Sequence, residues 1–132
     1  MDEPLSRGPG AYLLFVDLAA PLVLDIPRLG EPTLATGRYA YGGSAHGPGG
    51  LRARIGRHLR RDKAQHWHVD RLTAAGRVVQ VRAVPGGREC DLVRDLLELP
   101  GASVPVPGFG SSDCRACPAH LVALPTGFDP GL

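Results

Sequence analysis

The sequence has no long hydrophobic run. No uninterrupted apolar stretch approaches the roughly 20 residues that a membrane-spanning helix needs, so we expect no membrane partner. Cysteine is also scarce, with three residues, and no charged-then-apolar leader opens the chain. An odd cysteine count without a leader favours a reduced, cytoplasmic protein over a disulfide-bonded secreted one.

A strong overall charge is missing as well. The formal net charge is only +2, so the total does not indicate a polyanionic partner. The distribution is more informative, because five of the 14 arginines lie between Arg52 and Arg61. Such a cluster creates a local positive field that phosphates would feel, although a solvated helix face produces the same pattern.

The length of 132 residues and the apolar fraction of 43% predict one globular domain. We expect a loose lead-in at residues 1–9, the domain at 10–124 and a flexible tail at 125–132. The apolar patterning predicts an α+β fold, in which a small, mainly antiparallel sheet has helices around it. The expected strands are 11–18, 22–26, 33–36, the segment around Tyr39 and Tyr41, 77–84 and 119–124; the expected helices are 51–61, a short one ending at Ala75, and 88–99.

The segment before the arginine cluster predicts a strand that ends in a turn. Tyr39 and Tyr41 alternate, so their rings project from the same face of the strand. Gly42-Gly43-Ser44 follows, and we expect the backbone to turn sharply there. A phosphate could approach the backbone closely at such a turn.

The expected helix 51–61 has an apolar face and a cationic face. Leu51, Ile55 and Leu59 recur at helical spacing and predict the face toward the core. Gly56 costs about 1 kcal/mol relative to alanine inside a helix, so we expect close packing or ligand approach there. The other face carries residues at positions i, i+3, i+4 and i+7, which are Arg54, Arg57, His58 and Arg61.

An acidic residue lies on the apolar stripe of the expected helix 88–99. The stripe contains Leu92, Val93, Leu96 and Leu97, and steps of three or four residues back from it reach Glu89. Glu89 is therefore expected to face inward. The structural alternative is an acid that the helix dipole favours, worth about 0.3 to 1 kcal/mol.

Cysteine and histidine residues near the C-terminus have the spacing of metal ligands. Cys114-x-x-Cys117-x-x-His120 is such a pattern, and Cys90 could complete a Cys3His zinc site. No second C-x-x-C pair accompanies it, so the sequence favours the alternative of three reduced cysteines and a packed histidine.

Four features in order resemble the GIY-YIG nuclease superfamily. They are Gly10-Ala11-Tyr12, Tyr41-Gly42-Gly43, Arg54 with His58 four residues later, and the inward Glu89. The chain is most similar to the Uri-type branch, as a stand-alone member, and the likeness covers about residues 10–124. Further resembling segments are 50–54, 66–70, 89–90 and 108–114.

The resemblance implies a metal-dependent endonuclease that hydrolyses phosphodiester bonds in DNA, with RNA left open as a substrate. Glu89 would hold Mg²⁺ or Mn²⁺, Arg54 would bind the scissile phosphate, Tyr12 or Tyr41 would act as the base, and His58 would relay the proton. We expect these five residues to line one concave surface. The candidate substrate-binding residues are Arg52, Arg57, Arg61, Ser44, His66, His68, Ser111 and Ser112.

The chain departs from the superfamily pattern in three places. The stretch between the tyrosine triplets is long and is expected to add strands, Gly42 replaces an aliphatic residue, and Ser44 stands where many relatives have lysine. Two other functions therefore stay open. One is a nucleic-acid-binding module of the same fold with decayed catalysis, and the other is a zinc-stabilised interaction domain.

Overall fold

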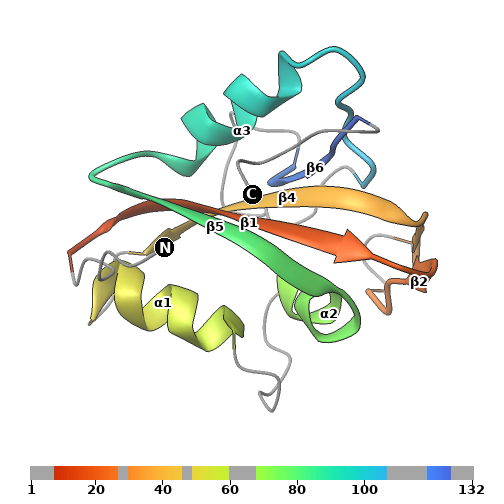
Figure 1. The fold of residues 1–132 in the computed structure, drawn as a ribbon, viewed down its shortest axis with the longest axis horizontal. Helices are drawn as coiled ribbons and strands as arrows, with labels where there is room; N and C mark the ends of the chain where they lie inside the picture. Colours follow the sequence, from red (N-terminus) through yellow and green to blue (C-terminus); the bar gives the residue numbers. More distant parts are fainter. Residues whose placement is uncertain (1–7, 27–29, 46–48, 60–67, 107–118, 126–132) are drawn as a thin grey trace.

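A four-stranded antiparallel sheet forms the centre of the protein, with its strands in the order β5-β1-β4-β6 (Figure 1). The computed structural model describes residues 8–26, 30–45, 49–59, 68–106 and 119–125. The sheet consists of β1 (Gly10–Leu18), β4 (Gly37–Ala45), β5 (Arg77–Pro85) and β6 (Leu121–Ala123).

Strand β1 lies in the middle of the sheet because nearly all of its side chains are apolar and buried. It pairs with β4 along its whole length and with β5 on its other edge. Asp17, its one charged residue, faces Arg38 across the pair and receives two hydrogen bonds from that guanidinium, at 2.6 and 2.9 Å.

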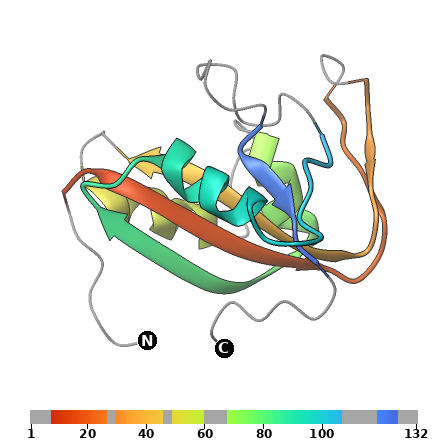
Figure 2. The ribbon, with the colours of Figure 1, turned by 90° about the horizontal axis from the view of Figure 1, so that it is seen from above.

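Helices cover both faces of the sheet (Figures 1 and 2). α1 (Gly50–Leu59) and α2 (His68–Ala75) pack on one face, and α3 (Glu89–Leu97) packs on the other against β1 and β4. The period of two along each strand separates the faces. On β1, Tyr12 belongs to the core under α1 and α2, whereas its neighbour Leu13 belongs to the core under α3.

The predicted fold class is confirmed: the fold is α+β, with a mainly antiparallel sheet and helices on its two faces. The inserted strands are present as β2 (Leu22–Val23) and β3 (Thr33–Leu34). They pair with each other in a separate two-stranded sheet, at the end of the central sheet where β1 ends (Figure 1). Both are shorter than predicted.

The expected turn at Gly42-Gly43-Ser44 is wrong, because β4 continues to Ala45. The two glycines serve close packing instead. A Cβ on Gly42 would lie 2.7 Å from Val93 Cγ2 of α3, and one on Gly43 would overlap the ring of Tyr12. One glycine therefore allows close contact on each face of the sheet.

The expected faces of α1 are partly wrong. Leu59 is 50% exposed, and His58 is buried beside Leu51 and Ile55 in its place. The buried stripe thus follows positions 51, 55 and 58, which are also spaced by four and three residues. Gly56 is exposed, with open space where a side chain would point, so no close packing explains it.

The lead-in before residue 8, the end of the predicted helix at residues 60–61 and the tail after residue 125 lie outside the described residues. Within the part of the chain that the structure describes, no helix has the length and apolar character to cross a membrane. The cytoplasmic location stays a prediction.

Candidate functional site

Three aromatic rings meet under the face of the sheet that α1 covers. Tyr12 comes from β1, Tyr41 from β4 and His58 from α1, and all three side chains are buried. The Tyr12 hydroxyl is hydrogen-bonded to His58 Nε2 at 2.7 Å. The ring centroids of Tyr41 lie 6.5 Å from Tyr12 and 6.2 Å from His58. The structure thus brings together three of the five residues predicted to be catalytic.

A buried acid completes this cluster, and the sequence prediction missed it. Asp70 in the first turn of α2 is fully buried, and its Oδ1 lies 4.0 Å from His58 Nδ1. If His58 carries its proton on Nδ1, that proton lies on the side of Asp70, and Nε2 can accept a hydrogen bond from the Tyr12 hydroxyl. The sequence contained one signal for this role, because Asp70 follows Val69 directly on a helix whose apolar side includes Leu72.

Asp70 is held by Arg57, a predicted substrate-binding residue. The guanidinium donates two hydrogen bonds to the carboxylate, Nη1 to Oδ1 at 2.9 Å and Nη2 to Oδ2 at 3.0 Å. This planar pairing neutralises a carboxylate that burial would otherwise make costly. Arg57 is therefore engaged inside the protein, and its expected contact with substrate phosphate has no support in this arrangement.

Arg54 lies between the tyrosine cluster and the end of β4. It is half-buried, and its Nη1 donates a hydrogen bond to the main-chain oxygen of Ser44 at 3.1 Å. Its charge acts on both phenols, lowering the pKa of Tyr12 and of Tyr41. Arg54, the residue predicted to bind the scissile phosphate, is thus electrostatically coupled to both tyrosines.

Burial nevertheless dominates the ionisation of the two tyrosines. Loss of water raises the pKa of Tyr41 to about 12 and raises that of Tyr12 even further, and in both cases Arg54 opposes the shift only in part. A second contribution comes from Tyr41 itself, which raises the pKa of Tyr12. Both phenols are protonated at neutral pH, so in this state they serve as hydrogen-bonding groups and not as bases.

That Glu89 shares one concave surface with the other four residues stays a prediction. The helices that carry Glu89 and Arg54, α3 and α1, pack on opposite faces of the sheet (Figure 1). Glu89 is half-buried in the first turn of α3, and its main-chain oxygen lies close to Gly42 of β4. Strand β6 pairs with β4 at residues 39–41 of β4. Gly42 is the next residue, so Glu89 lies beside the part of β4 that follows this pairing.

Glu89 still acts on the tyrosine cluster through its charge. The negative carboxylate raises the pKa of Tyr41, which also feels Arg54 and Asp70. Tyr41 is therefore packed beside Tyr12 and His58 and is influenced by the charges of Arg54 and Glu89.

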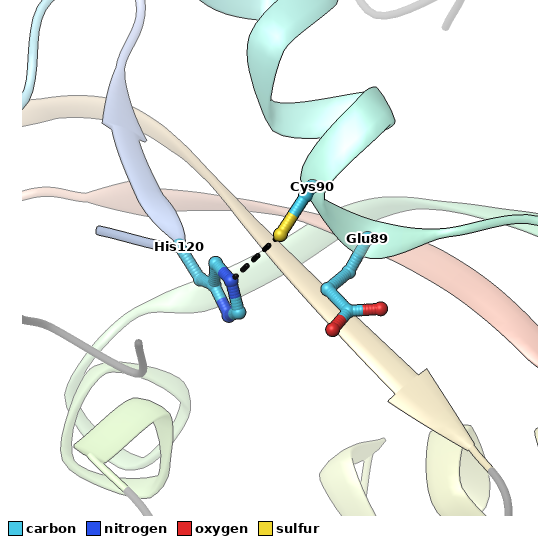
Figure 3. A group of neighbouring side chains, drawn as sticks. All are labelled: Glu89, Cys90 and His120. Atoms are coloured by element: carbon cyan, nitrogen blue, oxygen red, sulfur yellow. Dashed lines mark hydrogen bonds between the residues drawn. The ribbon is translucent and has the colours of Figure 1, made fainter. Parts of the chain in front are cut away.

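A second group of side chains surrounds Glu89 itself. Figure 3 shows Cys90 and His120 pointing toward one another with Glu89 beside them. Cys90 Sγ lies 3.7 Å from His120 Nε2, and the ligand atoms of the three residues all lie within 4.8 Å of one another. The Glu89 carboxylate alone suits the oxygen preference of Mg²⁺ or Mn²⁺, whereas the neighbouring sulfur and nitrogen suit a softer ion.

The family described as Domain of unknown function DUF123 matches residues 11–130. The chain belongs to this family. No curated protein and no solved structure shows a significant match.

In this DUF123 domain, the other predicted site residues fall into two groups. Arg52 is exposed on α1, Ser44 is half-buried at the end of β4, and His68 begins α2. The remaining predicted substrate or zinc ligands lie outside the described residues, and these are Arg61, His66, Ser111, Ser112, Cys114 and Cys117.

Proposed function

We propose that the protein is a GIY-YIG-type endonuclease that hydrolyses phosphodiester bonds in DNA with a divalent metal ion. The observation that carries the proposal is the buried Tyr12–His58 hydrogen bond with Arg54 beside it. These three residues stand at the positions that the sequence resemblance assigns to catalysis. A tyrosine and a histidine from distant parts of the chain are joined there by a hydrogen bond, which suits proton transfer.

The residues of the cluster have separate tasks in this proposal. Arg54 binds the scissile phosphate, because a planar guanidinium can donate two hydrogen bonds to phosphate oxygens. His58, oriented by Asp70, holds or accepts the proton of the Tyr12 hydroxyl. A bound phosphate and a metal ion held by Glu89 would add their own charges near the phenols, and these charges would change the ionisation of Tyr12 and Tyr41.

Glu89 supplies the metal ligand in the proposal. Mg²⁺ or Mn²⁺ is the prediction of the resemblance, and the ion would stabilise negative charge that develops on the phosphate. The carboxylate lies at the margin of the α3 face, and within the described residues no ion pair engages it. It is therefore available to a cation.

A nucleic-acid-binding module with decayed catalysis is the second candidate, and two observations favour it. Burial holds both phenols protonated, and Ser44 replaces the lysine that many relatives use near the phosphate. The third candidate, a zinc-stabilised interaction domain, draws on the contact between Cys90 and His120.

A cleavage screen tests the proposal. Purified protein is incubated with single-stranded, duplex, flapped and branched DNA, and with RNA, in Mg²⁺ or Mn²⁺. We expect cleavage of at least one DNA, and loss of cleavage in Arg54→Ala. The matched control is Arg94→Ala, which removes an exposed arginine of α3 that pairs with Asp91 and should not change the rate. DNA binding without cleavage by any ion would favour the module with decayed catalysis.

The salt dependence of binding separates a nucleic acid from a protein partner. If Arg52 and Arg54 contact phosphates, the logarithm of the affinity should fall linearly with the logarithm of salt concentration, by about 0.9 per contact on duplex DNA. Fluorescence anisotropy with labelled DNA measures this slope. A flat response would argue for a protein partner.

A further inference from the structure

Glu89, Cys90 and His120 come together from two distant segments. The first two open α3, and His120 directly precedes β6. The sequence suggested Cys90 and His120 as zinc ligands only in a set with Cys114 and Cys117. The structure adds Glu89, whose carboxylate the sequence assigned to a different ion.

The backbone holds the two segments close to each other. Gly42 N–H donates a hydrogen bond to the His120 carbonyl at 2.8 Å, which ties His120 to the edge of β4. The same Gly42 lacks a Cβ, which would lie 2.7 Å from Val93 Cγ2 and 3.5 Å from the Glu89 main-chain oxygen, so the start of α3 can lie close to β4. One glycine thus sets the positions of both halves of the cluster.

The distances fit a tetrahedral ion. Zinc bonds of about 2.0 to 2.3 Å separate two tetrahedral ligands by about 3.3 to 3.8 Å. Cys90 Sγ and His120 Nε2 are 3.7 Å apart, and the carboxylate oxygen lies within 4.8 Å of both.

We propose that Glu89, Cys90 and His120 form a binding site for Zn²⁺ or a similar transition-metal ion. The donors are one carboxylate oxygen, one thiolate sulfur and one imidazole nitrogen, a set that zinc accepts and Mg²⁺ does not favour. Binding releases the thiol proton to solvent, because the thiolate is the ligand. The proposal does not rest on nuclease activity, since binding is measured without nucleic acid.

The competing explanation is a hydrogen bond between thiol and imidazole with no metal involved. The distance of 3.7 Å between Sγ and Nε2 also suits such a bond. The two explanations differ in what Glu89 does. It is a ligand in the metal site and a bystander beside the hydrogen bond.

Cobalt and zinc titrations of the metal-free full chain decide between them. We expect Co²⁺ to produce a thiolate-to-cobalt charge-transfer absorption band, and Zn²⁺ to remove it even in a large excess of Mg²⁺. Cys90→Ser, which is nearly isosteric, should abolish the band. Glu89→Gln should weaken Zn²⁺ binding at least about tenfold in calorimetry, as loss of a ligand contact does.

Matched controls keep the result specific. Asp91→Asn neutralises an exposed acid in the same turn of α3 and should leave Zn²⁺ affinity unchanged. Circular dichroism and thermal melting show whether each variant is folded. A band that persists in Cys90→Ser, an unchanged affinity in Glu89→Gln, or no binding of either metal by the parent protein would overturn the proposal.

Discussion

The two faces of the central sheet bury residues of different chemistry. The face under α1 and α2 encloses polar groups, namely the Tyr12 and Tyr41 phenols, His58 and the Asp70 carboxylate. The buried cluster under α3 consists of apolar side chains, which are Leu13, Phe15, Ala40, Val93, Leu96 and Val122, and the Arg82 guanidinium lies over the Phe15 ring. Both faces are formed by the same strands, so adjacent residues of β1 such as Tyr12 and Leu13 belong to two different clusters.

The difference indicates where the fold bears an energetic cost. Burial of a polar group is unfavourable unless it is hydrogen-bonded, and a partly satisfied network is worse than an apolar core. The polar face meets this condition through Arg57 on Asp70 and through His58 on Tyr12. On the α3 face, the reactive side chains in the described part of the chain gather at the margin, where Glu89, Cys90 and His120 approach β4.

The largest expected effect is on the cleavage rate, and it tests whether a residue of the α3 side is needed for catalysis. Glu89→Gln on the α3 side should lower cleavage to below about one-hundredth of the parent rate, because an amide cannot offer the charge that holds a divalent cation. Nucleic-acid binding should persist, since the arginines are unchanged. If the charge served only the helix dipole, the variant would lose about 0.3 to 1 kcal/mol of stability and melt at a slightly lower temperature. It would still cleave nucleic acid at the parent rate. Paired melting and cleavage assays, with Asp91→Asn alongside, distinguish these outcomes.

The second effect compares a buried ion pair with an exposed one. Asp70→Asn should reduce the free energy of unfolding by about 3 kcal/mol or more, because it leaves the charge of Arg57 uncompensated in a largely buried position. Asp17→Asn, which breaks the half-exposed pair with Arg38 on the sheet surface, should cost about 1 kcal/mol or less. Urea unfolding at neutral pH measures both. Equal losses would contradict the proposed role of the buried network.

The third effect is a loss of stability when a methyl group is added to one glycine on each face of the sheet. Gly42→Ala and Gly43→Ala should each cost about 1 to 3 kcal/mol, because an added methyl overlaps Val93 on one side and the Tyr12 ring on the other. Gly43→Ala should also change the absorbance titration of the tyrosines. Gly42→Ala should instead weaken metal binding.

Gly56→Ala is the matched control for these two variants. Gly56 lies in α1 with open space around it, so alanine should stabilise the protein by up to about 1 kcal/mol. Melting temperatures order the three variants. A destabilised Gly56→Ala, or unchanged melting of the other two, would contradict the packing described for β4.

The smallest effect concerns pH and belongs to the polar face alone. The pKa of Tyr41 is about 12 in the folded protein and about 10 in an unfolded chain, so only the unfolded chain loses its proton between these values. Stability is therefore complete below pH 10 and falls as the pH rises toward 12. Between pH 10 and 11 the expected loss is about 1 kcal/mol from this group. Denaturant unfolding at the two pH values measures it, and Tyr41→Phe should show a smaller loss.

The elements of the fold were largely predictable from local pattern. Short apolar runs rich in β-branched or aromatic residues predicted the strands at Gly10–Leu18 and Arg77–Pro85. An apolar stripe at helical spacing predicted the helix Glu89–Leu97. The prediction at Gly42-Gly43 was wrong because a glycine that allows a turn and a glycine that allows close packing look alike in a sequence. Leu59 was placed in the core because position 58 and position 59 both continue a helical stripe.

The candidate site was predictable in its residue types and not in its geometry. The motif order identified Tyr12, His58 and Arg54, and the structure places them together. Asp70 was missed because its role depends on α2 packing beside α1, a contact that spacing along the chain does not reveal. The side of the sheet on which α3 packs could not be read from its apolar stripe, because a stripe shows which residues face a core and not which face of the sheet that core covers.

The sequence by itself determined the α+β class, because a period of two or of about 3.6 in apolar residues is a local property of each segment. It also determined which chemical groups are available, since tyrosine, arginine, histidine, glutamate and cysteine are encoded directly. Only the tertiary structure decided which groups meet. It buried Asp70 against Arg57, which lies 13 residues earlier, and it placed Cys90 beside His120, which lies 30 residues later, through contacts that form when helices and strands pack.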